Sequence, residues 1–179
     1  MNSSIFREYD IRGIADEDLT DDVVSDIGLA MGTIFAKKGL KKISIGRDCR
    51  KSSERIFNVL SSSIIKAGIS IVDLGMITTP VLYFSLYGLK IDGGVMITAS
   101  HNPSDYNGFK AAIGKDVLSA AQIQEIKNII RSKSFIQDTN LGTIEELNLI
   151  DIYKKDILKS INWNKKIRIG VDCANTPIG

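Results

Sequence analysis

The stretch that decides the fold is GGVMITASHNP, residues Gly93–Pro103, in which an apolar run leads directly into a polar loop. Residues Gly93–Thr98 are almost continuously apolar, a pattern typical of a strand buried on both faces of a parallel sheet. Working outward, a strand is expected over Lys42–Gly46 and another over Ile69–Leu74, each following a helical segment. The stretch therefore predicts an α/β fold in which polar loops follow buried strands.

Further elements are expected on both sides of this strand. The segment Thr20–Gly39 repeats apolar residues at helical spacing, with Thr20 as its cap and Gly39 as its stop. The other expected elements are a helix capped by Ser52 or Ser53, a short helix with Thr79 as cap and Pro80 at its first position, a strand over Phe109–Ile113, and a helix whose capping box pairs Ser119 with Gln122. This alternation predicts a three-layer α/β/α sandwich with a mainly parallel, mixed sheet.

The last part of the chain has a different character. Ser132–Thr143 is polar and is interpreted as a linker or an irregular crossing, and a helix is expected over Leu149–Ile161. Lys166–Asp172 has the pattern of a buried strand, which continues to Asn175 with no helix after it. A lone strand of this kind is where a second α/β unit would begin. We therefore expect one domain over residues 1–146, and a connecting helix with the first strand of an incomplete second domain over residues 147–179.

Composition excludes several classes of protein. Of 179 residues, 44% are hydrophobic and 25% are charged, which is unlike a disordered chain. The 23 Lys and Arg residues against 21 Asp and Glu argue against a nucleic-acid-binding protein, which needs many cations for phosphates. No apolar run approaches the ~18 residues of a membrane span. We expect neither nucleic acid nor a membrane as a partner.

Cysteine usage and the first residues indicate the compartment. Cys49 and Cys173 stand in no CxxC pair and form neither a disulfide framework nor a zinc set. They are interpreted as thiols in a reducing cytosol. The first ten residues carry Arg7, Glu8 and Asp10 and have no apolar core, unlike a signal peptide. The prediction is a cytoplasmic protein.

The loop after the central strand is the first candidate for chemistry. Loops beyond the carboxyl ends of strands bind ligands in open α/β sheets, so Ser100 stands where a nucleophile or phosphate carrier would be placed. The alternative is a polar turn shaped by Pro103. His101 is the only histidine and could activate Ser100, but neighbours on an extended loop point apart. No G-x-S-x-G elbow surrounds the serine, which argues against an α/β-hydrolase.

Three other stretches carry polar groups. Phe6–Gly13 holds arginines whose planar forks suit phosphate, or else it is an edge segment with ordinary ion pairs. In Asp105–Lys110, Asn107-Gly108 is a hairpin-turn signal that would carry Lys110 back toward Ser100. Gly46–Ser53 opens a helix, whose N-terminus attracts anions, but it lacks the glycine spacing of a P-loop. It is interpreted mainly as a structural turn with a capped helix.

Together these stretches resemble the α-D-phosphohexomutase superfamily, and within it the bacterial phosphomannomutase/phosphoglucomutase family. The resemblance implies that the chain is the first domain of a four-domain phosphohexomutase, followed by the start of the second domain at VDCAN, Val171–Asn175. The matching pieces, in the order of the family, are FREYDIRG at Phe6–Gly13, GRDCRKSS at Gly46–Ser53, TTPVLY at Thr78–Tyr83 and TASHNPSDYNGFK at Thr98–Lys110.

The resemblance implies a reaction centred on Ser100. In the family, the matching serine is phosphorylated and donates its phosphoryl group to a hexose monophosphate. The resulting bisphosphorylated sugar then returns its other phosphoryl group, so that hexose 1-phosphate and 6-phosphate interconvert. The resemblance also implies Mg2+ bound through the phosphate of Ser100, and a hexose 1,6-bisphosphate as activator. A phosphoserine brings about −1.5 to −2 charges, which require cations around it.

Roles for other residues follow from the same resemblance. Lys110 and His101 match residues near the transferring group, with Lys110 as a proton shuttle. Arg12, as a catalytic and substrate-binding residue, and Tyr9 match residues that face the phosphoserine and the substrate. Asn102 is expected to shape the loop and to help bind the substrate.

Some pieces of the family pattern are not found in this sequence. The DGDGDR metal loop, the GEMSG-type sugar loop and the C-terminal phosphate clamp do not occur, and residues 174–179 depart from the usual GNGxxG. We therefore expect this chain by itself to be inactive. Two alternatives are a phosphoglucosamine mutase, whose signature reads more like FGTDGIRG than FREYDIRG, and a non-catalytic module that binds a phosphosugar or a partner chain.

Overall fold

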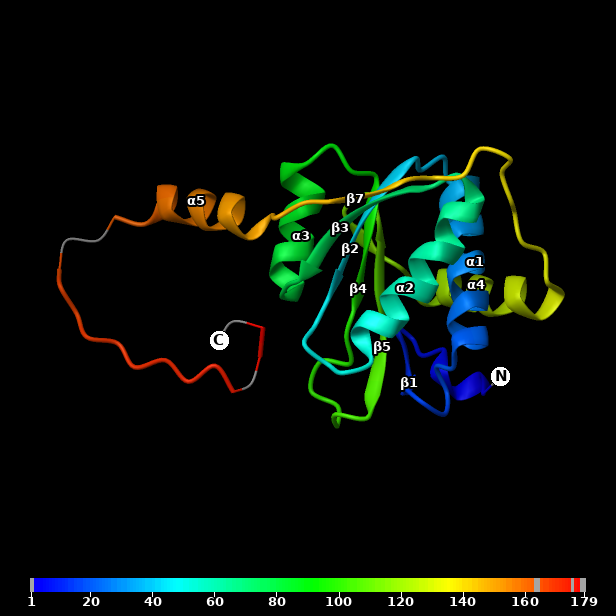
Figure 1. The fold of residues 1–179 in the computed structure, drawn as a ribbon, viewed down its shortest axis with the longest axis horizontal. Helices are drawn as coiled ribbons and strands as arrows, with labels where there is room; N and C mark the ends of the chain where they lie inside the picture. The colour runs from blue at the N-terminus through cyan, green and yellow to red at the C-terminus, as the bar shows by residue number, and fades with distance from the viewer. Residues whose placement is uncertain (1, 163–164, 175, 178–179) are drawn as a thin grey trace.

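The computed structural model describes residues 2–162, 165–174 and 176–177, and Figure 1 shows their arrangement. The helices are α1 (Asp21–Lys37), α2 (Ser53–Ile64), α3 (Thr79–Gly88), α4 (Ala120–Ser132) and α5 (Ile150–Ser160), with short 3-10 turns at Ser3–Ile5 and Ile65–Ala67. The strands are β1 (Ile11–Ile14), β2 (Lys42–Arg47), β3 (Ser70–Met76), β4 (Gly93–Ile97), β5 (Tyr106–Ile113), β6 (Asp116–Val117) and β7 (Ile144–Glu146).

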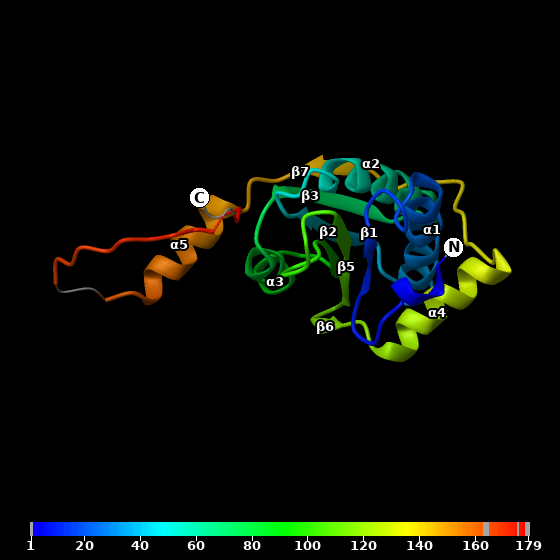
Figure 2. The same ribbon diagram turned by 90° about the horizontal axis from the view of Figure 1, so that it is seen from below.

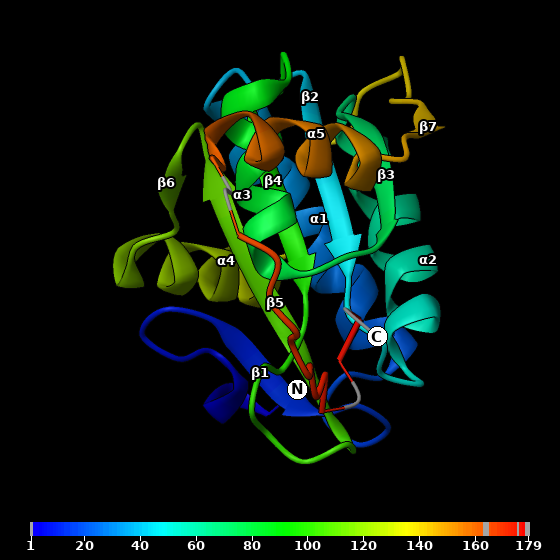
Figure 3. The same ribbon diagram turned by 90° about the vertical axis from the view of Figure 1, so that its left-hand side faces the viewer.

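The strands of the described residues form one seven-stranded mixed sheet in the order β1-β5-β4-β2-β3-β7, with β6 paired to β5. Strands β4, β2, β3 and β7 run parallel to one another, whereas β5 is antiparallel to β4, β1 and β6. Figure 3 shows β2 and β4 side by side, with their arrowheads at the same edge of the sheet. The loops that follow the parallel strands therefore meet at that edge.

Helices cover both faces of the sheet, which confirms the predicted three-layer α/β/α sandwich (Figure 2). On one face, α1, α2 and α4 pack in a large apolar cluster that includes Phe35, Ile45 and Phe109. On the other face, α3 packs in a smaller cluster that includes Leu82 and Met96. Because β4 lies between the two clusters, its five residues are all buried, as its apolar sequence predicts.

The predicted helix boundaries are confirmed in outline and differ at the caps. The capping box of Ser119 and Gln122 is present at α4. Thr20 and Ser52 occupy cap positions without a side-chain cap bond. The cap of α3 is Thr78 rather than Thr79, which places Pro80 at the second helical position. That shift is tolerated because the first-turn N–H groups of a helix have no partner inside it.

The C-terminal part confirms the helix and corrects the strand. Helix α5 has no buried residue, although Leu149 before it is buried and Tyr153 packs edge-on against Phe84 at 5.2 Å. The strand expected over residues 166–172 is not found, and Ile169 is 68% exposed. A strand needs ladder hydrogen bonds from a neighbour, and no segment among the described residues pairs with this one. Asn175, the expected end of that strand, lies outside the described residues.

Within the described ranges, no helix combines the length and the apolar composition that crossing a bilayer requires.

Candidate active site

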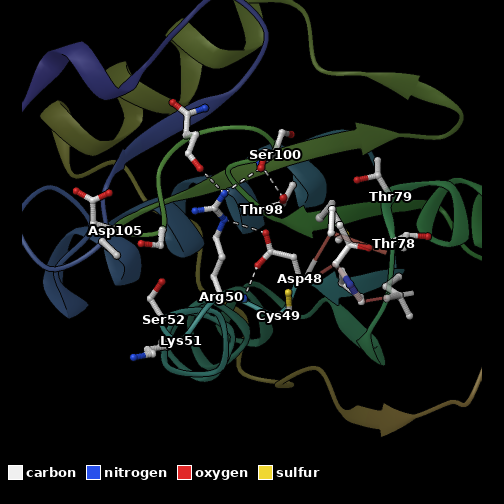
Figure 4. A pocket seen from close by; sticks show the side chains of 18 of the residues that line it. Asp48, Cys49, Arg50, Lys51, Ser52, Thr78, Thr79, Thr98, Ser100 and Asp105 are labelled. Atoms are coloured by element: carbon white, nitrogen blue, oxygen red, sulfur yellow. Dashed lines mark hydrogen bonds and ion pairs between the residues drawn. The ribbon is translucent and has the colours of Figure 1, made fainter. Parts of the chain in front are cut away.

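Polar loops converge at the carboxyl edge of the parallel strands. The loops after β2, β3 and β4 open on a cavity of about 1120 Å³ (Figure 4). Ligands of open α/β sheets bind at such an edge, so this cavity is the candidate site. Its lining consists of residues 48–52 after β2, residues 77–80 after β3, and Thr98, Ser100, Asn102, Ser104 and Asp105 after β4, together with Ala15, Asp16, Arg55, Met96, Ala174, Thr176 and Pro177.

Ser100 lies at the start of the turn that follows β4 and is exposed at the cavity. Its φ of 52° is in the left-handed region, which is costly for a residue with a Cβ. The Ser100 N–H donates to Thr98 Oγ1 at 2.9 Å. Both the backbone N–H and Nδ2 of Asn102 donate to Ala99 O, at 3.1 and 2.9 Å. These bonds hold the turn in its strained conformation.

The loop after β2 reaches across to this turn. Arg50 donates to main-chain carbonyl oxygens of the loop, including Ser100 O at 2.9 Å and Asn102 O at 2.7 Å. In Figure 4 the Arg50 guanidinium lies between Ser100 and Asp48 and is joined to both. The interpretation of residues 46–53 as mainly a structural turn is therefore incomplete, because this turn also holds the Ser100 loop.

A charged cluster lies on the same face of the sheet as the cavity. On β5, Lys110 is the strand partner of Met96, which lines the cavity. Gly108, two residues before Lys110 on the same strand, is the partner of Arg12. Because side chains alternate along a strand and opposite partners share a face, Arg12 and Lys110 lie on that face. The buried Asp10 carboxylate accepts from Lys110 Nζ at 3.3 Å and from Arg12 Nη2. The structure thus brings Arg12 and Lys110 together around a carboxylate.

The hairpin turn predicted at Asn107-Gly108 is wrong, because both residues lie inside β5. The chain turns earlier, over residues 100–105. The buried Asn107 side chain does not make a turn. Instead, it donates to Ser52 Oγ at 2.9 Å and to Ser53 Oγ at 3.0 Å, at the start of α2. Gly108 is required for a different reason: a Cβ there would overlap the backbone oxygen of Ile11 on β1.

Tyr9 and His101 are both exposed. Tyr9 is 64% exposed, and its pKa is raised by a side-chain hydrogen bond with Glu8 and by the charge of Glu8. His101 follows Ser100 in the turn and is exposed. Neither is among the described residues that line the cavity, and neither are Arg12 and Lys110, whereas Ser100 and Asn102 are.

The described side chains do not meet the requirements of a divalent cation. Mg2+ binds oxygen ligands in octahedral geometry and is held by a few carboxylates together with phosphates and water. Among the residues that the structure describes, no group of three or more His, Cys, Asp or Glu side chains could hold a metal ion. These side chains by themselves therefore do not form a metal site.

The fold and the site define a class of domain, an α/β/α sandwich with a serine-bearing turn at the carboxyl edge of its parallel strands. Residues 3–137 match the family model described as phosphoglucomutase/phosphomannomutase, alpha/beta/alpha domain I. The chain belongs to this family.

Individual relatives agree with this assignment. A phosphoglucomutase of Neisseria gonorrhoeae is 39% identical over 175 residues, covering 98% of this chain and 38% of the relative. A phosphomannomutase/phosphoglucomutase of Pseudomonas putida is 38% identical over 100% of this chain and 38% of the relative. The crystal structure of a phosphoglucomutase/phosphomannomutase family protein from Burkholderia thailandensis superposes with a TM-score of 0.87 at 32% identity, covering 92% of this chain and 37% of that one. The chain thus spans less than two fifths of the length of these relatives.

Two residues of the site were not found by sequence reasoning. Asp10 and Arg50 were quoted within their motifs but were given no role. Asp10 is 100 residues from Lys110 in the sequence, and Arg50 is 50 residues from Ser100. The available signal was weak: each is a charged residue inside a motif, with Asp10 directly before β1 and Arg50 on the loop after β2.

Proposed function

We propose that the full-length protein is a phosphomannomutase/phosphoglucomutase, an isomerase of carbohydrate metabolism that moves a phosphoryl group between the 1 and 6 positions of a hexose phosphate. The observation that carries the proposal is the position of Ser100. It lies in a fixed, strained turn at the cavity where the loops after three parallel strands meet, in a chain whose relatives carry these enzyme names.

In the proposed reaction, phosphorylated Ser100 is the donor. The bond between phosphorus and the serine oxygen breaks as a bond to a hydroxyl oxygen of the hexose monophosphate forms. The proton of that hydroxyl passes to a base, and the serine oxygen takes up a proton. The bisphosphorylated sugar then returns its other phosphoryl group to Ser100, which restores the phosphoserine. Hexose 1,6-bisphosphate acts as the activator, because it can phosphorylate Ser100 when the serine has lost its phosphate.

The charged cluster supports the electrostatic part of this proposal. Phosphoryl transfer is catalysed mainly by positioning and by cations around the phosphoryl oxygens. Arg12 and Lys110 supply two cations on the sheet face of Met96, which lines the cavity, and Asp10 forms an ion pair with each. We assign Lys110 as the proton shuttle and Arg12 as a catalytic and substrate-binding residue.

The remaining assignments depend on the loop and its surroundings. His101 would act beside the transferring group, Tyr9 would contact the substrate, and Asn102 would shape the loop and contact the substrate. The bonds from Asn102 to Ala99 O support the loop-shaping role.

Mg2+ is part of the proposal through Ser100. When bound, the ion would neutralise charge on the phosphoserine. The described side chains form no three-ligand group, so this chain would contribute only the oxygens of the Ser100 phosphate. The other ligands would come from the remainder of the protein.

We further propose that residues 1–146 form domain I and that residues 147–179 connect it to a second domain. The support is that α5 has no buried residue, in contrast to α1–α4. The 179-residue chain by itself would then be inactive. We also propose that the protein acts in the cytoplasm, as expected for an enzyme of hexose phosphate metabolism.

The test is a mutase assay of the full-length protein with glucose 1-phosphate or mannose 1-phosphate, activated by glucose 1,6-bisphosphate. We expect turnover in the wild type and none in Ser100→Ala. The matched control is Ser62→Ala, which changes an exposed serine on α2 and should keep full activity. Full activity in Ser100→Ala would refute the proposal. Glucosamine 1-phosphate as the preferred substrate would instead indicate a phosphoglucosamine mutase.

A further inference from the structure

Arg50 connects two loops that are far apart in the sequence. It belongs to the loop after β2 and its contacts are on the loop after β4 (Figure 4). Its Nη2 donates to Ser100 O at 2.9 Å and to Asn102 O at 2.7 Å. Its Nη1 donates to Tyr106 O at 3.0 Å and also to Pro103 O. These carbonyls span the whole turn that presents Ser100.

The donor capacity of the Arg50 side chain is fully used. A guanidinium has five N–H groups in a fixed planar fork. Four of them donate to the loop carbonyls, and Nε donates to Asp48 Oδ2 at 3.2 Å. The side chain is only 12% exposed. A phosphate in the cavity would therefore obtain a hydrogen bond from Arg50 only by displacing a loop carbonyl or the Asp48 carboxylate.

Arg50 is itself held in place from α2. Asp48 Oδ1 accepts from the Arg50 N–H at 3.1 Å and from Ser53 Oγ at 2.7 Å. Ser53 also receives the hydrogen bond from buried Asn107 on β5. The guanidinium thus projects from a short loop that is fixed at both ends, as a positioning group requires.

The bond to Ser100 O acts on the strained residue directly. Ser100 has a φ of 52°, which its own side chain disfavours. A donor on its carbonyl oxygen fixes the orientation of the peptide that follows, and so opposes relaxation of the turn. A strained residue keeps its conformation only where contacts with the surrounding groups hold it there.

We propose that Arg50 is a positioning residue for phosphoryl transfer at Ser100, which it serves by holding the main chain of the turn rather than by contacting the phosphoryl group. This inference rests on the proposed function of Ser100. A residue that binds the phosphate of the substrate would mainly change KM. A residue that positions the donor would change kcat, because a displacement of about 1 Å can cost about 10²-fold in rate.

The experiment uses the full-length protein with Arg50→Lys and Arg50→Ala. Lysine keeps the charge but offers three donors and no fork, so it cannot hold four carbonyls together. We expect kcat to fall by about 10²-fold in both variants, with KM changed by less than about threefold. The control is Arg131→Ala, an exposed arginine on α4, which should match the wild type.

A second readout is independent of activity. Amide hydrogen exchange of residues 99–106 should be faster in Arg50→Lys than in the wild type and in Arg131→Ala, because the turn opens more often without its carbonyl contacts. If the wild type shows no mutase activity but this exchange difference is found, the proposed function is wrong. The conclusion that Arg50 stabilises the turn is then still supported.

Three results would overturn the inference. The first is a wild-type kcat in Arg50→Lys, and the second is a raised KM with kcat unchanged. The third is loss of cooperative thermal unfolding in both variants, because Arg50 would then be required by the whole fold.

Discussion

The strain at Ser100 makes a quantitative prediction that requires no substrate. Ser100→Ala and Ser100→Gly both remove the hydroxyl, and both keep the N–H that donates to Thr98 Oγ1. They differ only in the Cβ, which at a φ of 52° costs about 1–2 kcal/mol. Ser100→Gly avoids this cost, but about 0.4–1 kcal/mol of the gain is lost because glycine gives the unfolded chain more conformational freedom. Ser100→Gly should therefore be more stable than Ser100→Ala by about 1 kcal/mol.

The assay is thermal unfolding of the purified chain, followed by circular dichroism. A difference of about 1 kcal/mol corresponds to about 2–4 °C in Tm for a chain of this size. The matched pair is Ser62→Ala and Ser62→Gly, at an exposed position inside α2. There the order should reverse, because glycine in a helix costs about 1 kcal/mol relative to alanine. An equal or higher Tm for Ser100→Ala than for Ser100→Gly would refute the assignment of strain to this residue.

Three further predictions concern the residues around the site. Gly108→Ala should lower the free energy of unfolding in urea by about 1–3 kcal/mol, because the added Cβ forces β1 away from β5; an unchanged midpoint would contradict this. Asn107→Ala should cost about 1–3 kcal/mol in the same assay, because the buried Gly108 N–H on β5 loses its acceptor, Asn107 Oδ1, and the Ser52 and Ser53 hydroxyls lose a donor. The pKa of Asp18 is lowered below 3.8 by hydrogen bonds from the Asn2 side chain and the Ile14 N–H. The stability that Asp18 contributes is therefore present above pH 3.8 and lost as the pH falls through the lowered value, so Asp18→Asn should lose less stability on acidification than the wild type.

Local signals made much of the fold predictable. The unbroken apolar run of β4 indicated a strand buried on both faces, and the Ser119 and Gln122 pair marked the start of α4. Both signals depend on neighbouring residues alone. The Asn107-Gly108 turn was wrong for the opposite reason. Its amide bonds to serines 54 and 55 residues away, and these long-range contacts keep the pair inside a strand.

In the candidate site, too, features signalled by neighbouring residues were predicted, and features set by long-range contacts were not. Ser100 was singled out because it directly follows a recognisable strand. Arg50 and Asp10 were not, because their roles depend on which strands are neighbours. The pairing of β2 with β4 brings Arg50 to the Ser100 turn, and the pairing of β1 with β5 brings Asp10 to Lys110. Strand order is a property of the whole chain, so a motif read alone does not reveal these contacts.

The most direct test of the account is to locate the phosphoryl group. The full-length protein would be incubated with glucose 1,6-bisphosphate and analysed by intact-mass measurement and peptide mapping. We predict the gain of one phosphoryl group on Ser100 and its loss when excess hexose monophosphate is added. A protein that gains no phosphoryl group, or that carries it on another residue, would contradict the account.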